Sequence, residues 1–341
     1  MVDVKVCTEQ AAWDAHIREH GGHPLQLWGW GTLKERGAWR AARLQVVDGD
    51  EVIGAAQVLR RSLPFPFRSF LYVPRGPVCA PEDRGRVLKA LRDYLKKNYS
   101  GKAVNIMIEP DWEGSMPAGS EEWKPARNKL LLGDTLVLDL TQDEETLLAA
   151  MHQKRRQDIR KFGNKGFELR EVTDHAGIAR CLEIYKEIAD RAGFELHADD
   201  YYYSIFDDLG EGSPVYELVD SEGETVGFQF LLVTPRVAFA LYGGVNAKGR
   251  KLRANGGFEW ECMKLMKSQG VEQFDLNGLL NDRISDFKRY FAKHENHFVG
   301  SYALPLSVVN PLWEVALPQA KKVMSKARGL LAKVKAKVKG S

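Results

Sequence analysis

The stretch DFKRYF, residues 286–291, places a lysine among aromatic rings. Lys288 directly follows Phe287 and lies three residues before Phe291. An ammonium group that neighbouring rings partly remove from water is suited to meeting negative charge in a cleft. The alternative is a solvated lysine on an amphipathic helix. The first interpretation makes Lys288 a candidate for stabilising an anion.

A second candidate site is the stretch YGGVNAKGRKLRANGGFEW, residues 242–260. A strand ends in it, a loop rich in glycine and cations follows, and a helix is expected to begin near Asn255. The free N–H groups of a helix start, with cations beside them, favour a phosphate ligand. In the acetyltransferase fold a [QR]xxGx[GA] loop binds pyrophosphate at this kind of turn. Here Arg253 begins RANGGF, and Phe258 replaces the second small residue, which weakens an acyl-CoA interpretation without excluding it.

Two tryptophans alternate with glycine in LQLWGWGTLK, residues 25–34, and a lysine follows. Trp28 and Trp30 precede Lys34, whose amine could lie at the rim of a groove. Tyr72 and Tyr242 end two other expected strands. Aromatic residues belong to a core more often than to a ligand platform, so both interpretations stay open.

Several classes of site lack their motifs. The histidines of HIREH and HENH do not match HExxH, and the four cysteines form no CxxC pair, so no metal is expected. There is no GxxxxGK[ST] loop, no GxGxxG after a strand and no GxSxG. Nucleoside triphosphate, dinucleotide and serine-nucleophile chemistry therefore have no support.

The strands and helices expected to position these residues form a pattern that occurs twice in the sequence. Residues 46–59 and 218–232 each indicate a strand, a turn with Asp and a second strand with an early glycine, Gly54 or Gly227. A third strand, a helix and a short strand follow in both halves at a nearly constant offset. This self-similarity predicts two related α/β domains, joined near residues 139–162. Thr141 and Glu144 have the spacing of a capping box for a helix there.

Composition and charge describe a globular protein with a basic end. The 341 residues suffice for two domains, and no apolar run could span a membrane. The polar, mixed-charge start lacks the features of a signal peptide, so we expect a cytoplasmic protein with reduced cysteines. Residues 319–341 hold seven lysines and Arg328 without Asp or Glu, which leaves −5 for the rest of a chain whose total is +3.

This tail has the pattern of a basic amphipathic helix. Its apolar residues recur at helical spacing with lysines opposite, which is typical of a helix lying on an anionic membrane surface. Packing on the body and contact with tRNA are the alternatives. The membrane is the first choice and tRNA the second.

Together these stretches resemble the FemXAB-type (FemX/MurM-like) aminoacyltransferases that build peptidoglycan interpeptide bridges. The resemblance rests on LQLWGWGTLK, YVPRGPV, IEPD, LLAAMHQKRRQDIRKFGNKG, YKEIADRAGF, ALYGGV, FEWECMKLMKSQG and FKRYF, which follow the family's order over most of the chain. It implies an α/β fold of two tandem GNAT-like (acyl-CoA N-acyltransferase fold) domains. We expect these at residues 1–145 and 146–300, followed by a return segment, 301–318, on the first domain and the tail, 319–341.

The resemblance also implies roles for single residues. Lys288 matches the catalytic-site lysine, and Asp111 of IEPD is a weaker candidate for acceptor binding or for the base. Five residues are implied to bind substrate: Lys34 and Arg191 at the phosphates of the precursor, with Trp30, Tyr242 and Phe287 lining the cleft. Asp158 stands where the family often has Asn, and no helical arm for gripping tRNA is present.

The implied reaction transfers an amino acid from aminoacyl-tRNA to a side-chain amine on the stem peptide of a peptidoglycan precursor. The precursor is lipid II or UDP-MurNAc-pentapeptide, and no cofactor or metal is expected. Aminolysis of an ester passes through an oxyanion, which the ammonium of Lys288 would stabilise. Two alternatives remain: an acyl-CoA-dependent N-acyltransferase, and a non-catalytic protein that binds a membrane or RNA surface.

Overall fold

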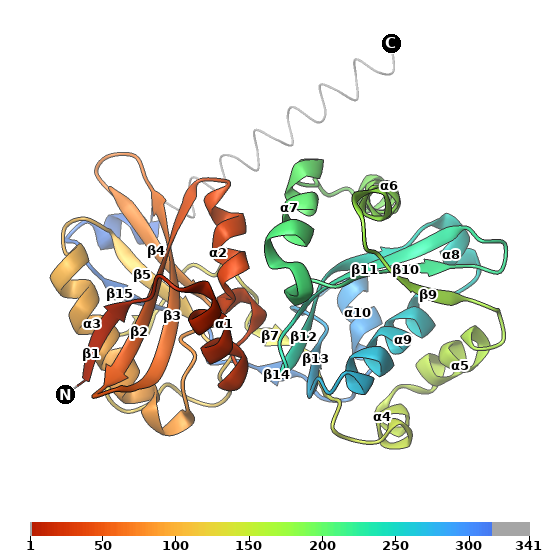
Figure 1. The fold of residues 1–341 in the computed structure, drawn as a ribbon, viewed down its shortest axis with the longest axis horizontal. Coiled ribbons are helices and arrows are strands. Elements are labelled where there is room, and N and C mark those ends of the chain that lie inside the picture. Colours follow the sequence, from red (N-terminus) through yellow and green to blue (C-terminus); the bar gives the residue numbers. More distant parts are fainter. Residues whose placement is uncertain (1, 316–341) are drawn as a thin grey trace, which may run out of the picture.

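Two mixed sheets, one in each half of the chain, form the framework of the molecule (Figure 1). The structure, a computed structural model, describes residues 2–315. The predicted tail, residues 319–341, and the end of the predicted return segment lie outside the described residues. No helix among the described residues has the length and apolar character needed to cross a bilayer.

The first sheet has seven strands in the order β1-β2-β3-β4-β5-β15-β6. All neighbours are antiparallel except β4 and β5, which are parallel and joined through α3. The strands are β1 (Val2–Val6), β2 (Trp39–Asp48), β3 (Glu51–Ser62), β4 (Ser69–Pro74), β5 (Asn105–Glu109), β6 (Lys124–Pro125) and β15 (Tyr302–Pro305). The helices of this half are α1 (Gln10–Glu19), η1 (Pro24–Gln26), α2 (Trp28–Glu35), η2 (Pro81–Asp83) and α3 (Arg84–Tyr99).

The second sheet has six strands in the order β8-β13-β12-β11-β10-β9. Here β12 and β13 are the parallel pair, joined through α8 and α9. The strands are β8 (Val137–Asp139), β9 (Glu168–Glu171), β10 (Val215–Val219), β11 (Thr225–Val233), β12 (Val237–Val245) and β13 (Gln273–Asp275). The helices are α4 (Glu144–Ala150), α5 (Gln153–Phe162), α6 (His175–Ala192), α7 (Asp199–Leu209), η3 (Gly210–Gly212), α8 (Ala247–Lys251), α9 (Asn255–Ser268) and α10 (Arg283–Arg289). A separate small pair of strands consists of β7 (Asp134–Thr135) and β14 (Asn296–His297).

The predicted duplication is confirmed at the level of topology. Strands β2, β3, β4 and β5 with α3 repeat as β10, β11, β12 and β13 with α9, in the same order and the same directions. The expected boundary after residue 145 falls beyond β8, which already pairs with β13. The chain therefore enters the second sheet before that boundary.

The helix at the junction begins differently from the prediction. Asp143, not Thr141, caps α4 by accepting a hydrogen bond from the backbone N–H of Thr146. The hydroxyl of Thr141 instead donates to the carboxylate of Asp139 at 2.6 Å. Asp and Thr are both good N-cap residues. Thr141 lies two residues after the end of β8 and bonds to Asp139 there, so Asp143 serves as the cap.

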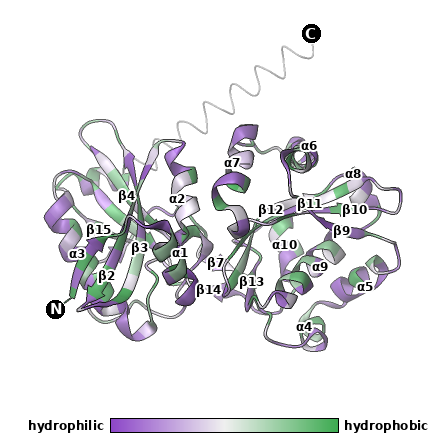
Figure 2. Cartoon of the chain, in the orientation of Figure 1, coloured by the Kyte–Doolittle hydropathy of each residue, from purple (hydrophilic) through white to green (hydrophobic). Residues whose placement is uncertain are grey.

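Helices carry both hydrophobic and hydrophilic residues (Figure 2), and α3 buries Val87, Leu88, Leu91 and Leu95. One core lies between the first sheet and α3, and two lie on the two faces of the second sheet. The core beneath α6 and α7 includes Leu25, Trp30 and Leu33, which come from the first half. Helix α2 therefore belongs to the packing of both halves.

Close contact between α2 and α7 joins the halves. A Cβ at Gly29 would overlap the backbone oxygen of Asp208, so glycine permits this approach. At the next turns Arg36 donates from Nε and Nη2 to both oxygens of the Asp208 carboxylate, each at 2.6 Å. The bidentate pair fixes the orientation of the two helices.

Candidate active site

The side chain of Lys288 reaches the point where β12 and β13 stop pairing. Helix α10 begins at Arg283, after the N-cap Asp282, whose side chain accepts from the N–H of Ser285. One turn later the Nζ of Lys288 donates to the carbonyls of Asn277 and Gly278, at 3.1 and 2.9 Å. An ammonium group has three N–H donors, and only two are used within residues 2–315, which leaves one for a ligand.

The strands part because β13 ends in a tight turn. Pairing between the two strands stops at Phe239 and Asp275. Asn277 then adopts a φ of 65°, in the left-handed region, where asparagine is among the more tolerated residues. Its Nδ2 donates to the carbonyl of Ala240 at 3.3 Å, which spans the gap where the next backbone bonds would be.

Two buried carboxylates, those of Glu259 and Asp275, and the exposed carboxylate of Asp282 act electrostatically on the lysine. Burial lowers the pKa of Lys288, and the negative charges of Glu259, Asp275 and Asp282 act in the opposite direction. Burial raises the pKa of Glu259 to about 7, against the attraction of Lys288 and Arg155. Among the described residues, the Oε1 of Glu259 has no hydrogen-bond partner. The ammonium thus lies in a poorly solvated site, where its charge acts strongly.

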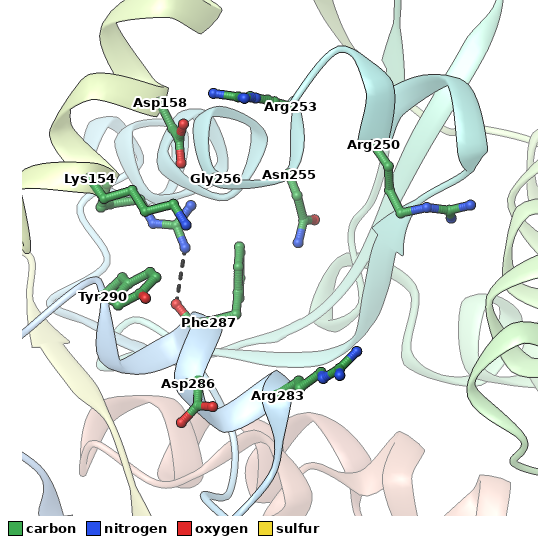
Figure 3. Close-up of a pocket in the computed structure, with 11 residues that line it drawn as sticks. Lys154, Asp158, Arg250, Arg253, Asn255, Gly256, Arg283, Asp286, Phe287 and Tyr290 are labelled. Carbon is green, nitrogen blue, oxygen red and sulfur yellow. Dashed lines mark hydrogen bonds between the residues drawn. The ribbon is translucent and has the colours of Figure 1, made fainter.

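A cavity of 380 Å³ opens between α5, α10 and the start of α9 (Figure 3). Cations outnumber carboxylates along it. Its lining consists of Lys154, Arg155, Asp158, Arg250, Arg253, Asn255, Gly256, Arg283, Asp286, Phe287 and Tyr290. The N-terminal end of the 14-residue helix α9 also faces this cavity. Free backbone N–H groups and side-chain cations together suit a phosphate group.

Arg155 forms the wall between this cavity and the interior. Its Nη2 donates to the backbone oxygen of Phe287 at 3.0 Å, the bond drawn in Figure 3. Its guanidinium stacks on the rings of Phe287 and Phe291, each 4.2 Å from the ring centroid. Burial lowers its pKa to about 10, so it stays charged at neutral pH. A Cβ at Gly256 would overlap its Nη1, so this glycine makes room for the arginine.

A second cationic group lies between α2 and α7. The Nζ of Lys34 donates to the hydroxyl of Tyr201 at 2.8 Å and lies 4.1 Å from the ring centroid of Trp30. Burial lowers the pKa of Lys34 to about 8. The hydroxyls of Tyr201 and Tyr242 are hydrogen-bonded, and the pKa of Tyr242 is raised mainly by burial. The ring of His197 lies 4.2 Å from that of Tyr201.

One strand connects the two groups. Tyr242 follows Ala240 by two residues on β12, and packs with the core beneath α6 and α7. Ala240 packs with the core on the other face, beneath α9. Phe287, beside Lys288, packs with the same core as Ala240, whereas Tyr242 packs with the other, so α10 and the Lys34 group lie on opposite faces of the sheet.

The structure brings together Lys34, Trp30 and Tyr242, and separately Lys288 and Phe287. Arg191 is exposed in the last turn of α6, before the loop that carries His197 towards Tyr201. Its side chain has no described contact that ties it to Lys34.

Asp111 lies elsewhere. Its carboxylate pairs with Arg236, which precedes β12, and lines a cavity of 200 Å³ with His23 and Asp275. Lys288 lies beyond the opposite end of β13, so the structure does not bring these two residues together.

Sequence reasoning missed three contributors to the site. Arg155 belongs to a run of cations, residues 154–156, of a kind that normally faces water, yet it is buried. Tyr201 was not singled out, although three consecutive tyrosines, 201–203, were a usable signal. Glu259 carried no signal, because an acid in a helix is usually solvated.

One acidic group among residues 2–315 has the spacing of a metal site. Its members are Asp220, Glu222 and Glu224. The ammonium of Lys248 forms ion pairs with all three carboxylates and already supplies their counter-charge.

Two family models match the chain. The FemAB family model matches residues 8–136, and the acetyltransferase (GNAT) domain model matches residues 153–289. One matched region lies in each of the two duplicated halves. The fold is therefore a pair of tandem GNAT-like domains, as the sequence predicted.

Two similar proteins share one name. Lipid II:glycine glycyltransferase of Staphylococcus haemolyticus (strain JCSC1435) is 21% identical over 415 residues, covering 96% of this chain and 97% of the relative. The protein of the same name from Staphylococcus aureus is 27% identical over 214 residues, covering 58% of this chain and 50% of the relative.

Solved structures agree on the fold. A crystal structure of FemX has a TM-score of 0.82 at 19% identity, covering 92% of this chain and 99% of FemX. L-PGS from Bacillus licheniformis has a TM-score of 0.57 at 14% identity, covering 91% of this chain and 96% of the other. A tandem GNAT protein from the clavulanic acid biosynthesis pathway has a TM-score of 0.50 at 12% identity, covering 90% and 99%.

Proposed function

Because the chain belongs to the FemXAB-type family and is an aminoacyltransferase, we propose that it acts on a peptidoglycan precursor. The donor is an aminoacyl-tRNA, and the acceptor is the side-chain amine of the stem peptide of lipid II or UDP-MurNAc-pentapeptide. The relatives named above act on lipid II by their names, which supports this acceptor class.

The observation that carries the proposal is the single free donor of Lys288, held where β12 and β13 part. The acceptor amine attacks the ester carbonyl, and a C–N bond forms. The C–O bond to the tRNA ribose then breaks, the amine loses a proton and the ribose oxygen gains one. The carbonyl oxygen is negative in the tetrahedral intermediate, and the buried ammonium stabilises it.

The donor approaches from the cavity at the start of α9. Its cations and helix N–H groups suit the phosphates at the end of an RNA strand. Phe287 and Tyr290 offer ring faces on which an unpaired base can stack. This cavity is lined by Phe287, the neighbour of Lys288 in the chain, and not by Lys288 itself, so the ester at the end of the RNA must pass Phe287 to reach the ammonium.

The acceptor approaches from the α2–α7 side. Lys34 supplies a cation for a precursor phosphate, with Trp30 and Tyr242 lining the approach. Arg191, which is exposed in the last turn of α6, supplies a second cation for the precursor phosphate. Asp111 is assigned to acceptor binding, because Arg236 holds its carboxylate away from Lys288.

We also assign the protein to the inner face of the cytoplasmic membrane. The assignment rests on the basic sequence of residues 319–341, which lie outside the described residues. Deleting these residues should reduce sedimentation with anionic liposomes, and unchanged sedimentation would contradict this assignment.

A donor screen tests the reaction. Purified protein is incubated with muropeptide precursor and either a panel of charged tRNAs or acetyl-CoA, and products are read by mass spectrometry. We expect an aminoacyl mass on the stem-peptide amine from one or a few tRNAs. Transfer from acetyl-CoA alone would replace this proposal with acyl-CoA chemistry, and no transfer from any donor would favour a binding protein.

A further inference from the structure

Apolar side chains are exposed together on one face of the first half. This face, called here the docking face, consists of residues 60–68, 127–130 and 308–315. Phe65 is 93% exposed at the tip of the β3–β4 hairpin, and Val308 is 96% exposed. Leu130, Leu312 and Val315 are also exposed large hydrophobic residues. Solvent-exposed hydrophobic residues that gather in this way mark an interaction surface more often than a chance arrangement.

Trp313 holds the three segments of the face together. Its ring lies 5.1 Å from that of Phe67 and 6.0 Å from that of Phe70, on the hairpin. It also lines a small cavity with Arg127 and Leu130. Helix residues 310–315 therefore lie against the hairpin, which stands at the upper left in Figure 1.

The outward positions of this last helix are apolar as well. Val309 and Trp313 pack inward. Leu312 and Val315 are three residues apart, which places them on one helix face, and both are exposed. Val308 is exposed in the turn just before the helix. A solvated helix normally carries polar residues there, so this face lacks a partner among the described residues.

The same surface is rich in cations and poor in acids. Residues 52–81 contain no Asp or Glu, and Arg60, Arg61 and Arg68 are exposed around the hairpin tip. Residues 123–133 and 296–313 also contain no acid. Glu314 is the acid at the centre of the face, and it pairs with Arg127 at 3.7 Å.

We propose that the docking face binds the surface of an anionic phospholipid bilayer. Phe65, Val308 and Leu312 enter the boundary between headgroups and acyl chains, while the arginines meet lipid phosphates. RNA would use the arginines, but the aliphatic side chains of Val308 and Leu312 offer it nothing. The chain leaves the described structure from this face, and the lysine-rich residues 319–341 follow directly.

The location also fits an acceptor that is anchored in lipid, a point that rests on the proposed function. Trp39 packs with the cluster around Phe70 and Trp313, 6.2 Å from the ring of Phe70. It follows Lys34 by five residues, just after α2. A bilayer on the docking face would therefore lie beside the end of α2 that carries the acceptor cation.

Vesicle sedimentation of the full-length chain tests the inference without any activity measurement. The double variant Phe65→Ser/Leu312→Ser removes two exposed apolar groups and leaves the charge and the tail unchanged. The matched control is Val6→Ser, another exposed apolar residue, on strand β1. Vesicles are phosphatidylcholine with or without phosphatidylglycerol, each at low and high salt, and circular dichroism checks folding.

We expect the double variant to bind anionic vesicles about tenfold or more weakly than wild type or Val6→Ser. The difference should be largest at high salt, because screening weakens the lysine tail and not apolar insertion. Equal binding of all three proteins at both salt concentrations would overturn the docking face and leave the tail as the anchor. The docking face would also be overturned if Arg61→Gln/Arg68→Gln loses tRNA on filters while vesicle binding stays at the wild-type level. Because no transfer is measured, failure here does not bear on the proposed reaction.

Discussion

The ammonium of Lys288 donates to the backbone carbonyl of Asn277, 11 residues earlier in the chain, at 3.1 Å. A second hydrogen bond, to the carbonyl of Gly278, fixes the ammonium group at the end of β13. These two bonds also fix the direction of the third N–H group, which has no partner among the described residues. A charge held in this way needs little reorganisation when an oxyanion forms, and this preorganisation is its value in catalysis.

Replacing this charge should therefore affect turnover more than binding. We expect Lys288→Met to lower kcat by roughly 10²–10³ and to change the KM for the precursor little. Steady-state transfer from charged tRNA gives both constants. The control is Lys293→Met, an exposed lysine after α10. A loss confined to KM would place Lys288 in substrate binding instead.

Acceptor binding should depend on pH through Lys34. Burial lowers its pKa to about 8, so the free protein carries this charge below pH 8 and loses it above. A phosphate ligand needs the charged form, so its Kd should rise up to about tenfold per pH unit above pH 8. Isothermal titration with a soluble precursor measures the slope.

Lys34→Arg supplies the control for that slope. A guanidinium stays protonated throughout this pH range, so the variant should show a flat profile. If wild type and Lys34→Arg have the same pH dependence, another group controls binding.

The glycine beside Arg155 should be intolerant of a methyl group. In Gly256→Ala the new Cβ overlaps Nη1 of Arg155, which must move away from Phe287 and the cavity. We expect a loss of about 1–3 kcal/mol of stability and a higher KM for charged tRNA. Gly163→Ala is the matched control, because its Cβ would lie 3.8 Å from the nearest atom, the backbone oxygen of Arg160. Denaturant unfolding and donor titration test the pair, and equal behaviour of the two variants would count against this role of Arg155.

Glu259 should make stability depend on pH. Its folded pKa of about 7 lies above the ordinary 4.5, so the folded state favours the protonated carboxyl. This contribution is fully present below pH 4.5 and is lost as the pH rises through 7. It amounts to about 3 kcal/mol in total. Relative to Glu259→Gln, wild type should therefore lose stability between pH 4.5 and 8 in urea unfolding. Parallel pH curves for the two proteins would show that Lys288 and Arg155 fully compensate the buried charge.

The contact between α2 and α7 should support the acceptor group. Gly29→Ala would push the backbone of Asp208 away and separate Lys34 from Tyr201. We expect lower stability, by about 1–3 kcal/mol, and weaker precursor binding. Gly37→Ala, whose Cβ would lie 3.6 Å from the backbone oxygen of Lys34, should resemble wild type in both measurements. Intact precursor binding in Gly29→Ala would show that the acceptor does not need this contact.

The repeated topology was readable from sequence because it rests on local pattern. Each copy has alternating strands, a turn with Asp and a glycine such as Gly54 or Gly227, and these signals do not depend on distant partners. A local pattern also indicates Lys288 as a candidate site residue, since its aromatic neighbours are adjacent in the chain.

Residues whose roles depend on distant partners could not be placed. Asp111 finds Arg236 125 residues away, and no local pattern indicates that pair. Arg155 lies in a run of cations that normally face water, and it is buried only because Gly256 leaves room for it. The Asp111–Arg236 pair and the burial of Arg155 both depend on packing between distant elements, which cannot be predicted from a single sequence.

The insertion of Trp30 and Leu33 from α2 into the core beneath α6 and α7 limits how the ancestral duplication could be undone. If the two copies were expressed separately, the second would expose the apolar surface that α2 covers. The first would expose the apolar side chains of α2. We therefore expect that neither copy folds stably alone, and that the two can be exchanged between relatives only as a pair.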